Sequence, residues 1–243
     1  NKEVPISRIL NHQIVAVPYF IASSQTFVNE HIVELGSVDS SEIYYSINND
    51  TYKKYIEPIT INEQSIISSY AKRGNKKSKI VSSEYFPRDD TKKIKILSTY
   101  ANQYAAAGEK TLIDQLRGGN NYRTGNWQGY REDVNVIVDL SETKKINSIS
   151  LGCHQDVRSW IFFPKQVEYW TSNDDINYEY QGKVLANFSD KIEGSFHKDF
   201  TLKLKNLKTR YIKIKAENYG VCPEWHLGAG GKTWVFVDEI TIK

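Results

Sequence analysis

Short runs of alternating apolar and polar residues recur along the first part of the chain. Turn formers such as Asn48-Asn49-Asp50 and Arg73-Gly74-Asn75 separate them. The runs predict strands at 14–20, 26–35, 42–47, 59–61, 65–72, 79–85 and 93–97. Strands this short and this closely spaced are typical of an antiparallel, immunoglobulin-like β-sandwich. We therefore expect a first domain over 1–97, in which 1–13 form a lead-in arm.

The pattern changes after Leu97. The alanine-rich segment 98–110 predicts a short helical turn or a linker, and a polar loop rich in Gly and Asn follows it. Strands are then predicted at 135–140, 146–152, 166–172, 178–184, 198–204, 210–215 and 234–242. This spacing favours a jelly roll, whose ligand-binding loops gather at one end. We therefore expect a second domain over 98–243, and an all-β fold for both domains.

Charge and hydropathy exclude several classes of partner. The formal net charge is +3, from 32 basic and 29 acidic residues that are well mixed along the chain. This balance argues against a nucleic acid or an anionic membrane surface as the partner. No segment approaches the roughly 20 apolar residues that a membrane helix requires. The start of the chain lacks a signal peptide's apolar core, and the sequence contains no Met, so we expect it to begin within a longer protein.

The first domain carries motifs in a characteristic order. They are Ile43-Tyr44-Tyr45-Ser46, the segments 55–61 and 66–71, Gly74 and Ser78. In this order they resemble the small β-sandwich that follows the catalytic barrel in chitobiases and β-hexosaminidases. Where that family has an Asp-Gly-Ser-x-Pro-Thr turn, this chain has Asn48-Asn49-Asp50-Thr51.

The second domain carries a longer ordered set. It comprises Leu112-Ile113-Asp114, Asn126-Trp127-Gln128-Gly129, 136–140, 164–174 and Val237-Asp238-Glu239-Ile240. This set resembles the discoidin, or coagulation factor 5/8 type C, domain, which is called a family 32 carbohydrate-binding module in bacterial glycosidases. Both domains together resemble the C-terminal region of β-N-acetylhexosaminidases of glycoside hydrolase family 20. The resemblance implies a non-catalytic region that binds glycans with terminal galactose or N-acetylhexosamine. It also implies an upstream catalytic domain and an extracytoplasmic location in a bacterium, in the periplasm or at the cell surface.

Two loops of the second domain hold candidate ligand-binding residues. The long segment 218–239 combines aromatic rings and polar tips with four glycines, and long loops run over surfaces and tend to carry function. From this loop we select Tyr219, Glu224, Trp225 and His226. From 152–164, which faces the ligand in the resembling modules, we select His154, Arg158 and Trp160. In the alternative interpretation, Trp160, Phe162 and Phe163 pack over the sandwich end and Arg158 pairs with Asp156. Trp127 and Trp234 are expected to be buried.

The resemblance also implies a structural calcium ion. The matching positions are Asp114, Asn120 or Asn121, Thr124 and Glu239, and calcium binds oxygen ligands of this kind. The neighbouring cation Arg117 is unfavourable for such a site.

The two cysteines, Cys153 and Cys222, do not form a CxxC motif, so they do not suit a zinc site. We expect either a disulfide between them or two buried free thiols.

No nucleophile elbow, HExxH, P-loop or dinucleotide motif is present. We therefore assign no catalytic residue. Two other functions stay open: a purely structural appendage that braces a catalytic barrel, and a stand-alone glycosidase, for which scattered Asp and Glu pairs give the weakest support.

Overall fold

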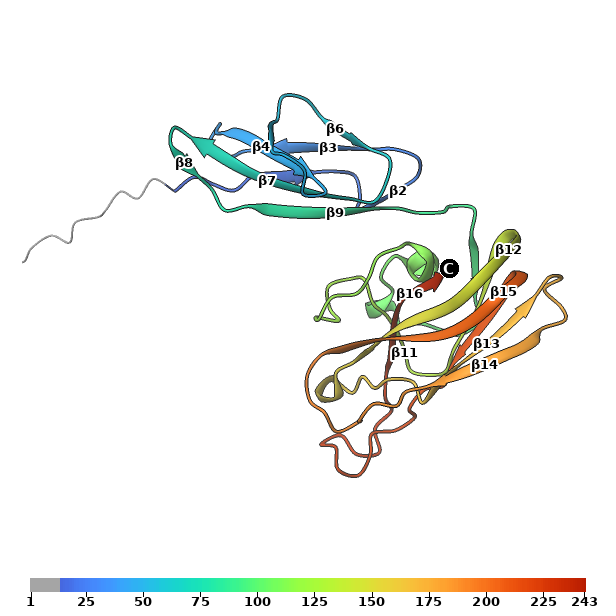
Figure 1. The fold of residues 1–243 in the computed structure, drawn as a ribbon. Helices are drawn as coiled ribbons and strands as arrows, with labels where there is room; N and C mark the ends of the chain where they lie inside the picture. Colours follow the sequence, from blue (N-terminus) through green and yellow to red (C-terminus); the bar gives the residue numbers. More distant parts are fainter. Residues whose placement is uncertain (1–13) are drawn as a thin grey trace, which may run out of the picture. The chain divides into compact units, whose positions relative to one another are not determined.

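The structure is a computed structural model that describes residues 14–243, so the expected arm over 1–13 lies outside the described residues. The chain forms two compact units that divide between Pro87 and Arg88 (Figure 1). The sequence pattern predicts the division ten residues later, after Leu97. The strand β10 (Lys93–Ile96) causes the difference, because it pairs with residues 136–139 and packs Ile94 and Ile96 against the second core. Its alternating pattern identifies a strand but not the sheet that the strand joins.

The N-terminal unit is a β-sandwich, as expected. Its smaller sheet has the order β1 (Tyr19–Ile21), β3 (His31–Gly36), β6 (Ile59–Ile61). Its larger sheet has the order β2 (Thr26–Phe27), β9 (Val81–Pro87), β7 (Ser65–Arg73), β4 (Glu42–Ile47), β5 (Lys53–Lys54), and β8 (Lys76–Lys77) pairs with β7. Alternate residues of both sheets, such as Val33, Ile43 and Ile67, bury their side chains in one core. The period of two therefore decides which face of each strand is buried.

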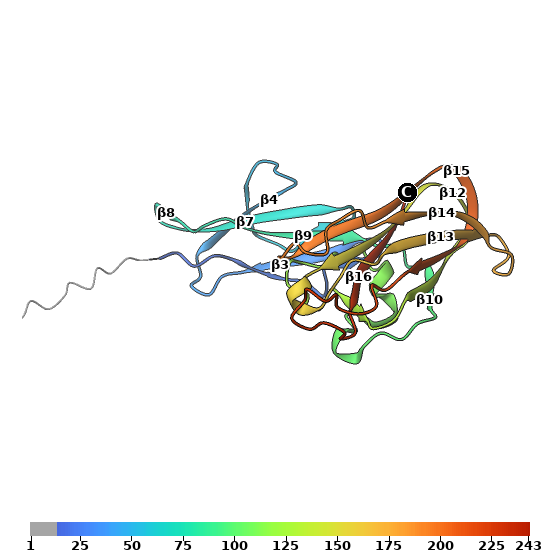
Figure 2. The ribbon, with the colours of Figure 1, turned by 90° about the horizontal axis from the view of Figure 1, so that it is seen from below.

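The C-terminal unit begins with β10 and two 3₁₀ helices, η1 (Asn102–Tyr104) and η2 (Gly108–Ile113), which confirm the helical turn expected in 98–110. Its other elements are β11 (Gln128–Tyr130), β12 (Val134–Gln155), η3 (Val157–Ser159), β13 (Gln166–Ser172), β14 (Glu179–Leu185), β15 (Phe196–Ala216) and β16 (Val235–Ile242). The strand order is β11-β16-β12-β15-β13-β14, with β10 on β12. Figure 2 shows β12 to β15 side by side. None of the helices in the described part of the chain is long or apolar enough to cross a membrane.

The long strands β12 and β15 each replace two shorter strands that the sequence predicted. Their pairing shifts register between Asp139 and Lys144 and again between Ile146 and Ser148. Such irregularities bend a ladder. Residues from both sides of the bend, including Val138 and Ile149, share the same core cluster. The sheet therefore folds over on itself around one core.

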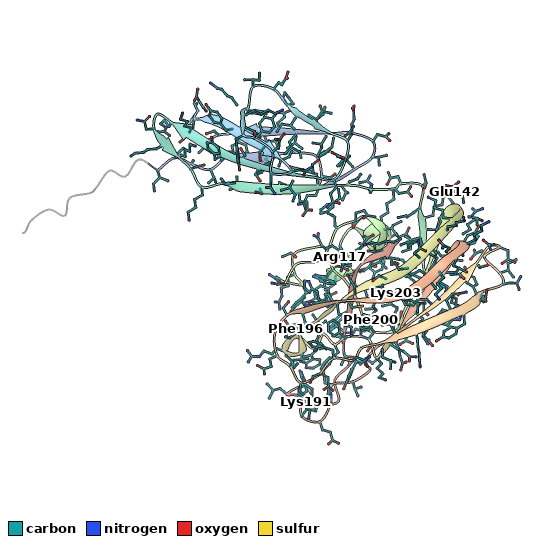
Figure 3. All side chains as sticks on the ribbon, in the orientation of Figure 1. Arg117, Glu142, Lys191, Phe196, Phe200 and Lys203 are labelled. Carbon is teal, nitrogen blue, oxygen red and sulfur yellow. The ribbon has the colours of Figure 1, made fainter. Side chains whose placement is uncertain are left out.

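Because of this bend, the two ends of β12 lie at the same end of the unit. The amide of Phe163 donates to Oε1 of Gln155, the last residue of β12, at 3.3 Å. Two residues later, the amide of Lys165 donates to the carbonyl of Glu217, directly after β15, at 2.9 Å. The bend itself lies at the other end of the unit. Figure 3 shows Glu142, at the bend, at one end and Lys191, in the loop 186–195, at the other. The loops 156–165, 186–195 and 217–234 therefore gather at one end, as the jelly-roll pattern predicted.

Burial settles three expectations. Trp127 is buried, with Nε1 donating to the carbonyl of Gly119 at 2.9 Å, and Trp234 is buried beside it in the same aromatic cluster. Cys153 and Cys222 are both buried and free, which confirms the second of the two alternatives for the cysteines. Burial raises the pKa of both thiols, which keeps them protonated and unreactive.

Candidate functional site

The loops 156–165 and 217–234 are joined to each other by their main chains. The amide of Phe162 donates to the carbonyl of Trp234 at 3.1 Å, and the amide of Trp234 donates to the carbonyl of Trp160 at 2.8 Å. Cys222 packs with Val157 and Phe162 between the loops. The two segments that the sequence identified as functional therefore form one surface.

A hollow of about 510 Å³ opens where these loops meet. It is lined by Val157, Arg158, Trp160, Glu193, Trp225, His226 and Leu227, and we call it the aromatic hollow. Trp160 and Trp225 keep 36% and 41% of their surface exposed, and Leu227 is fully exposed. Large exposed rings that share a hollow are typical of a contact surface rather than of a core.

Trp160 is held in place by its own backbone and by two glycines. Its φ of 64° is in the left-handed region, at the end of the η3 turn, where its amide donates to the carbonyl of Val157 at 3.0 Å. A Cβ on Gly228 would lie 2.4 Å from Cζ2 of the indole, and a Cβ on Gly231 would lie 2.4 Å from Cζ3. The ring therefore packs directly on the main chain of the second loop, which requires glycine at both positions.

His226 lines the aromatic hollow, but both of its ring nitrogens are used by the backbone. The amide of Gly228 donates to Nδ1 at 2.9 Å, which places the ring proton on Nε2. Nε2 lies 2.7 Å from the carbonyl of Val157 and donates to it. His226, which the sequence suggested as a ligand contact, therefore fixes the two loops together instead of offering a free polar group.

The prediction that His154 contacts a ligand is wrong. Its side chain is fully buried, and its ring centroid lies 4.9 Å from that of Trp127 and 5.1 Å from that of His197. Burial lowers the pKa of His154 to about 4. The reason is its position: His154 is still within β12, paired with His197 and Phe236, and does not belong to the loop that follows.

Arg158 reaches the aromatic hollow and pairs with Glu193, which raises the pKa of the guanidinium. The alternative partner, Asp156, instead accepts a hydrogen bond from Ser159 at 2.8 Å. Both members of the Arg158–Glu193 pair are largely exposed, with side-chain exposures of 74% and 60%. Exposed pairs are weak, so both groups can exchange partners with a ligand. Glu193 and Leu227 were not identified from the sequence, because a charged residue or a lone Leu in a polar loop gives no signal.

Tyr219 and Glu224 do not line the aromatic hollow. The ring of Tyr219 stacks on Phe162 at 4.6 Å, and its hydroxyl donates to Asp190 at 2.5 Å. Tyr219 thus supports the loop from behind. Glu224 is exposed on the same loop as Trp225 but is not among the lining residues.

Two of the positions expected to hold calcium are neighbours in the structure. Asp114 and Glu239 lie close enough to interact, and Oε2 of Glu239 accepts from the amide of Gln115 at 2.9 Å. Burial raises the pKa of Asp114 to about 6 and that of Glu239 to about 9. Oε1 of Glu239 is buried without a hydrogen-bond partner, which is the kind of orphaned oxygen that a cation would satisfy.

The other two expected ligands have different partners. The carbonyl of Asn120 accepts from Ser195 at 2.8 Å, and the hydroxyl of Thr124 donates to the carbonyl of Asn121 at 2.8 Å. Arg117 lies beside this region, with Nε 3.3 Å from Asp238. Over residues 14–243, no group of three or more His, Cys, Asp or Glu side chains is arranged to hold a metal ion. The calcium site over Asp114, Asn120 or Asn121, Thr124 and Glu239 therefore stays a prediction.

Comparison with known proteins adds a family and several distant relatives. Two uncharacterized ATP-binding proteins of Methanocaldococcus jannaschii are 31% identical over 119 residues and 28% identical over 121 residues, covering 44% and 46% of this chain. The chain spans about a third of the length of these curated relatives, 33% and 34%.

Two solved structures are similar at low identity. One is the module CpGH89CBM32-5 from Clostridium perfringens in complex with GalNAc-beta-1,3-galactose, with 16% identity, a TM-score of 0.42 and coverage of 63% of this chain and 95% of that one. The other is the C-terminal domain of a chitobiase from Bacteroides fragilis, with 20% identity, a TM-score of 0.35 and coverage of 62% and 92%.

The F5/8 type C domain family matches residues 93–230. This match begins at β10, which the structure places in the C-terminal unit, and includes all the residues that line the aromatic hollow. Because it covers more than half of the sequence, the chain belongs to the F5/8 type C domain family.

Proposed function

We propose that the C-terminal unit binds a carbohydrate in the aromatic hollow and makes or breaks no bond there. The observation that carries the proposal is the pairing of exposed Trp160 and Trp225 with the exposed ion pair of Arg158 and Glu193 in one hollow. A sugar ring has apolar C–H faces and a polar rim of hydroxyls. Such a ligand matches a surface that offers ring faces beside hydrogen-bonding tips.

Each side chain has a distinct role in this proposal. Trp225 supplies the more exposed ring face, and Trp160 forms the wall that the glycines fix in place. Arg158 donates to hydroxyl oxygens and Glu193 accepts from hydroxyl protons. Aromatic stacking of a nucleic-acid base contributes about 1–3 kcal/mol, which is an upper guide for a sugar. A hollow this open buries little of its ligand, so dissociation constants of about a millimolar are expected.

The finer identity of the ligand and of the whole protein follows from the sequence resemblance. We propose terminal galactose or N-acetylhexosamine as the sugar, and a secreted β-N-acetylhexosaminidase of a bacterium as the protein to which the chain contributes its C-terminal region. A binding unit attached to an enzyme raises the local concentration of substrate around the catalytic domain. Calcium belongs to the same set of proposals, with Asp114, Asn120, Thr124 and Glu239 as its ligands.

A glycan array with the whole chain tests the sugar proposal. Trp225→Ala and Arg158→Gln should each abolish retention, whereas Tyr180→Ala, which removes a half-exposed ring from β14 outside the hollow, should leave it unchanged. Retention of no glycan by the unmodified chain at millimolar concentration would instead support a structural appendage. Release of a chromogenic aglycone would support the glycosidase alternative, and we expect none.

A further inference from the structure

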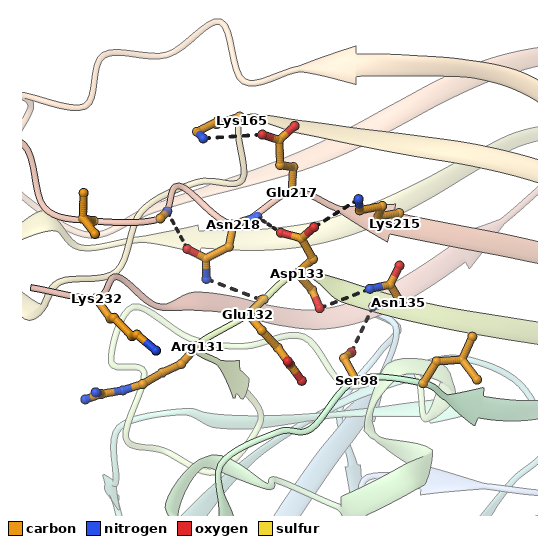
Figure 4. Close-up of a pocket in the computed structure, with 13 residues that line it drawn as sticks. Ser98, Arg131, Glu132, Asp133, Asn135, Lys165, Lys215, Glu217, Asn218 and Lys232 are labelled. Carbon is orange, nitrogen blue, oxygen red and sulfur yellow. Dashed lines mark hydrogen bonds and ion pairs between the residues drawn. The ribbon is translucent and has the colours of Figure 1, made fainter.

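A second and larger hollow, of about 880 Å³, opens in the C-terminal unit (Figure 4). Its walls come from the segment before β12, the end of β15 and the loop 217–234. Almost all of its side chains are charged or polar, in contrast to the aromatic hollow. We call it the polar hollow.

The two hollows share one loop. Gly220, Val221 and Lys232 line the polar hollow, whereas Trp225 to Leu227 line the aromatic hollow. Val221 and Lys232 pair through a β-bridge at the base of the loop, and the residues between them form its crown. The base of this loop therefore belongs to one hollow and its crown to the other, at the same end of the unit.

The acidic side chains of the polar hollow already have partners. Asp133 accepts from the amide of Asn218 at 2.9 Å and pairs with Lys215 at 3.1 Å. Glu217 pairs with Lys165 at 3.4 Å. Glu132 accepts from the amide of Thr99 at 2.6 Å. Figure 4 shows the pair of Lys165 with Glu217 and the contacts of Asp133 with Asn218 and Lys215.

Two cations remain without an acidic partner. In the described chain, neither Arg131 nor Lys232 forms an ion pair, although both line the polar hollow. The guanidinium of Arg131 lies 4.4 Å from the ring centroid of Trp234, which holds it in place by a cation–π contact and leaves its edge donors free. Among the described residues the carboxylate of Glu132 also forms no ion pair, so the four cations and three carboxylates of the lining leave the hollow with a net charge of +1. This arrangement favours an anion.

We propose that the polar hollow is a binding site for an anionic group, a carboxylate or a sulfate, held by Arg131 and Lys232. A planar guanidinium binds such groups through paired hydrogen bonds, and Lys232 adds a second positive charge. Because the two hollows share a loop, the natural ligand that we infer is an acidic glycan that carries its charged group here. This last step rests on the proposed sugar binding, whereas the anion site itself does not.

NMR titration of the whole chain tests the site with three probes: glucuronate, inorganic sulfate and neutral N-acetylgalactosamine, all at matched ionic strength. Glucuronate or sulfate should shift amide signals of 131–135 and 218–221. Arg131→Gln and Lys232→Gln should each weaken this binding about tenfold, which is the usual effect of losing one charge-assisted hydrogen bond. Lys203→Gln, which removes an exposed charge outside the hollow, should change nothing. Raising the salt concentration should weaken the binding of the two anions and leave the binding of the neutral sugar unchanged.

Two results would overturn the site: no shift with either anion, or equal anion binding by the wild type and both variants. A difference between glucuronate and sulfate would identify which charged group the site accepts. Trp225→Ala separates this proposal from the sugar proposal. That variant should no longer bind the neutral sugar but should still bind the anion. A negative result at one hollow therefore leaves binding at the other hollow measurable.

Discussion

The ring of His226 joins the two loops of the aromatic hollow, because Nε2 donates to the carbonyl of Val157 at 2.7 Å while Nδ1 accepts from the amide of Gly228. The two residues are 69 positions apart in the sequence. His226 is buried, so neither hydrogen bond is exchanged easily with water. The shape of the hollow therefore depends on a residue whose polar atoms do not face the ligand.

His226→Phe should destabilise the C-terminal unit by about 1–3 kcal/mol, because it leaves a buried carbonyl and a partly buried amide without partners. All five tryptophans lie in this unit, at 127, 160, 170, 225 and 234, so the fluorescence change in denaturant reports its unfolding alone. His226→Gln keeps a hydrogen-bond donor and an acceptor, so it should lose less stability than His226→Phe. An unchanged midpoint in the phenylalanine variant would mean that the two hydrogen bonds contribute nothing.

Gly228→Ala should displace Trp160, because the new Cβ would lie 2.4 Å from the indole ring. Overpacking of this kind typically lowers the free energy of unfolding by about 1–3 kcal/mol. Because the ring is displaced, the variant should also lose sugar binding. Gly119→Ala is the matched control, since nothing lies within 4 Å of its Cβ position. Comparison of unfolding midpoints and glycan retention for the two variants checks the prediction. Equal behaviour of both would show that the contact between Trp160 and the loop is unimportant.

The alternating pattern predicted most strands because burial of one face is a local property. β13 (Gln166–Ser172) and β4 (Glu42–Ile47) begin and end where the pattern predicted. The same pattern missed the continuity of β12 and β15, since the bend near Ser141 depends on pairing between distant segments. It also assigned β10 to the N-terminal unit, whereas β10 belongs to the C-terminal unit. Sheet membership is decided by tertiary contacts that no local period encodes.

The candidate site was only partly predictable for the same reason. Composition located the two loops, and Trp160, Trp225 and Arg158 do share a hollow. Sequence could not distinguish His154 from them, because the end of β12 lies just beyond it, at Gln155, and decides whether the side chain faces the core. Nor could it identify Glu193, which comes from a third loop.

The stability of the C-terminal unit should fall as the pH is lowered from about 6.5 to about 4, in part because of His154. Burial lowers its pKa from 6.5 to about 4, so in this window the unfolded chain binds a proton that the folded chain does not. This contribution is fully present above pH 6.5 and is lost as the pH falls to the folded value. The shift corresponds to about 3 kcal/mol.

His154→Phe should remove that part of the pH dependence and keep an aromatic ring against Trp127. The difference in the free energy of unfolding between variant and wild type should therefore grow in favour of the variant as the pH falls through this window. Tyr122→Phe, which changes a neighbouring ring and leaves the imidazole of His154 in place, should follow the wild type. Parallel curves for wild type and His154→Phe would show that His154 does not carry a lowered pKa.

Calcium should raise the unfolding temperature of the wild type and leave that of Glu239→Gln unchanged, because the orphaned Oε1 of Glu239 is the oxygen that the cation would satisfy. At a concentration 100 times the dissociation constant, a ligand that binds only the folded state stabilises it by about 2.7 kcal/mol. A chelator should reverse the rise in unfolding temperature. Magnesium should raise it less than calcium does, because magnesium requires octahedral coordination at shorter metal–oxygen distances. Arg117→Gln removes the cation next to Asp238 and should strengthen the response. The absence of a response in both the wild type and Arg117→Gln would leave Glu239 as a buried acid that stays protonated at neutral pH, with its pKa raised to about 9 by burial first and by the neighbouring Asp114 and Asp238 second.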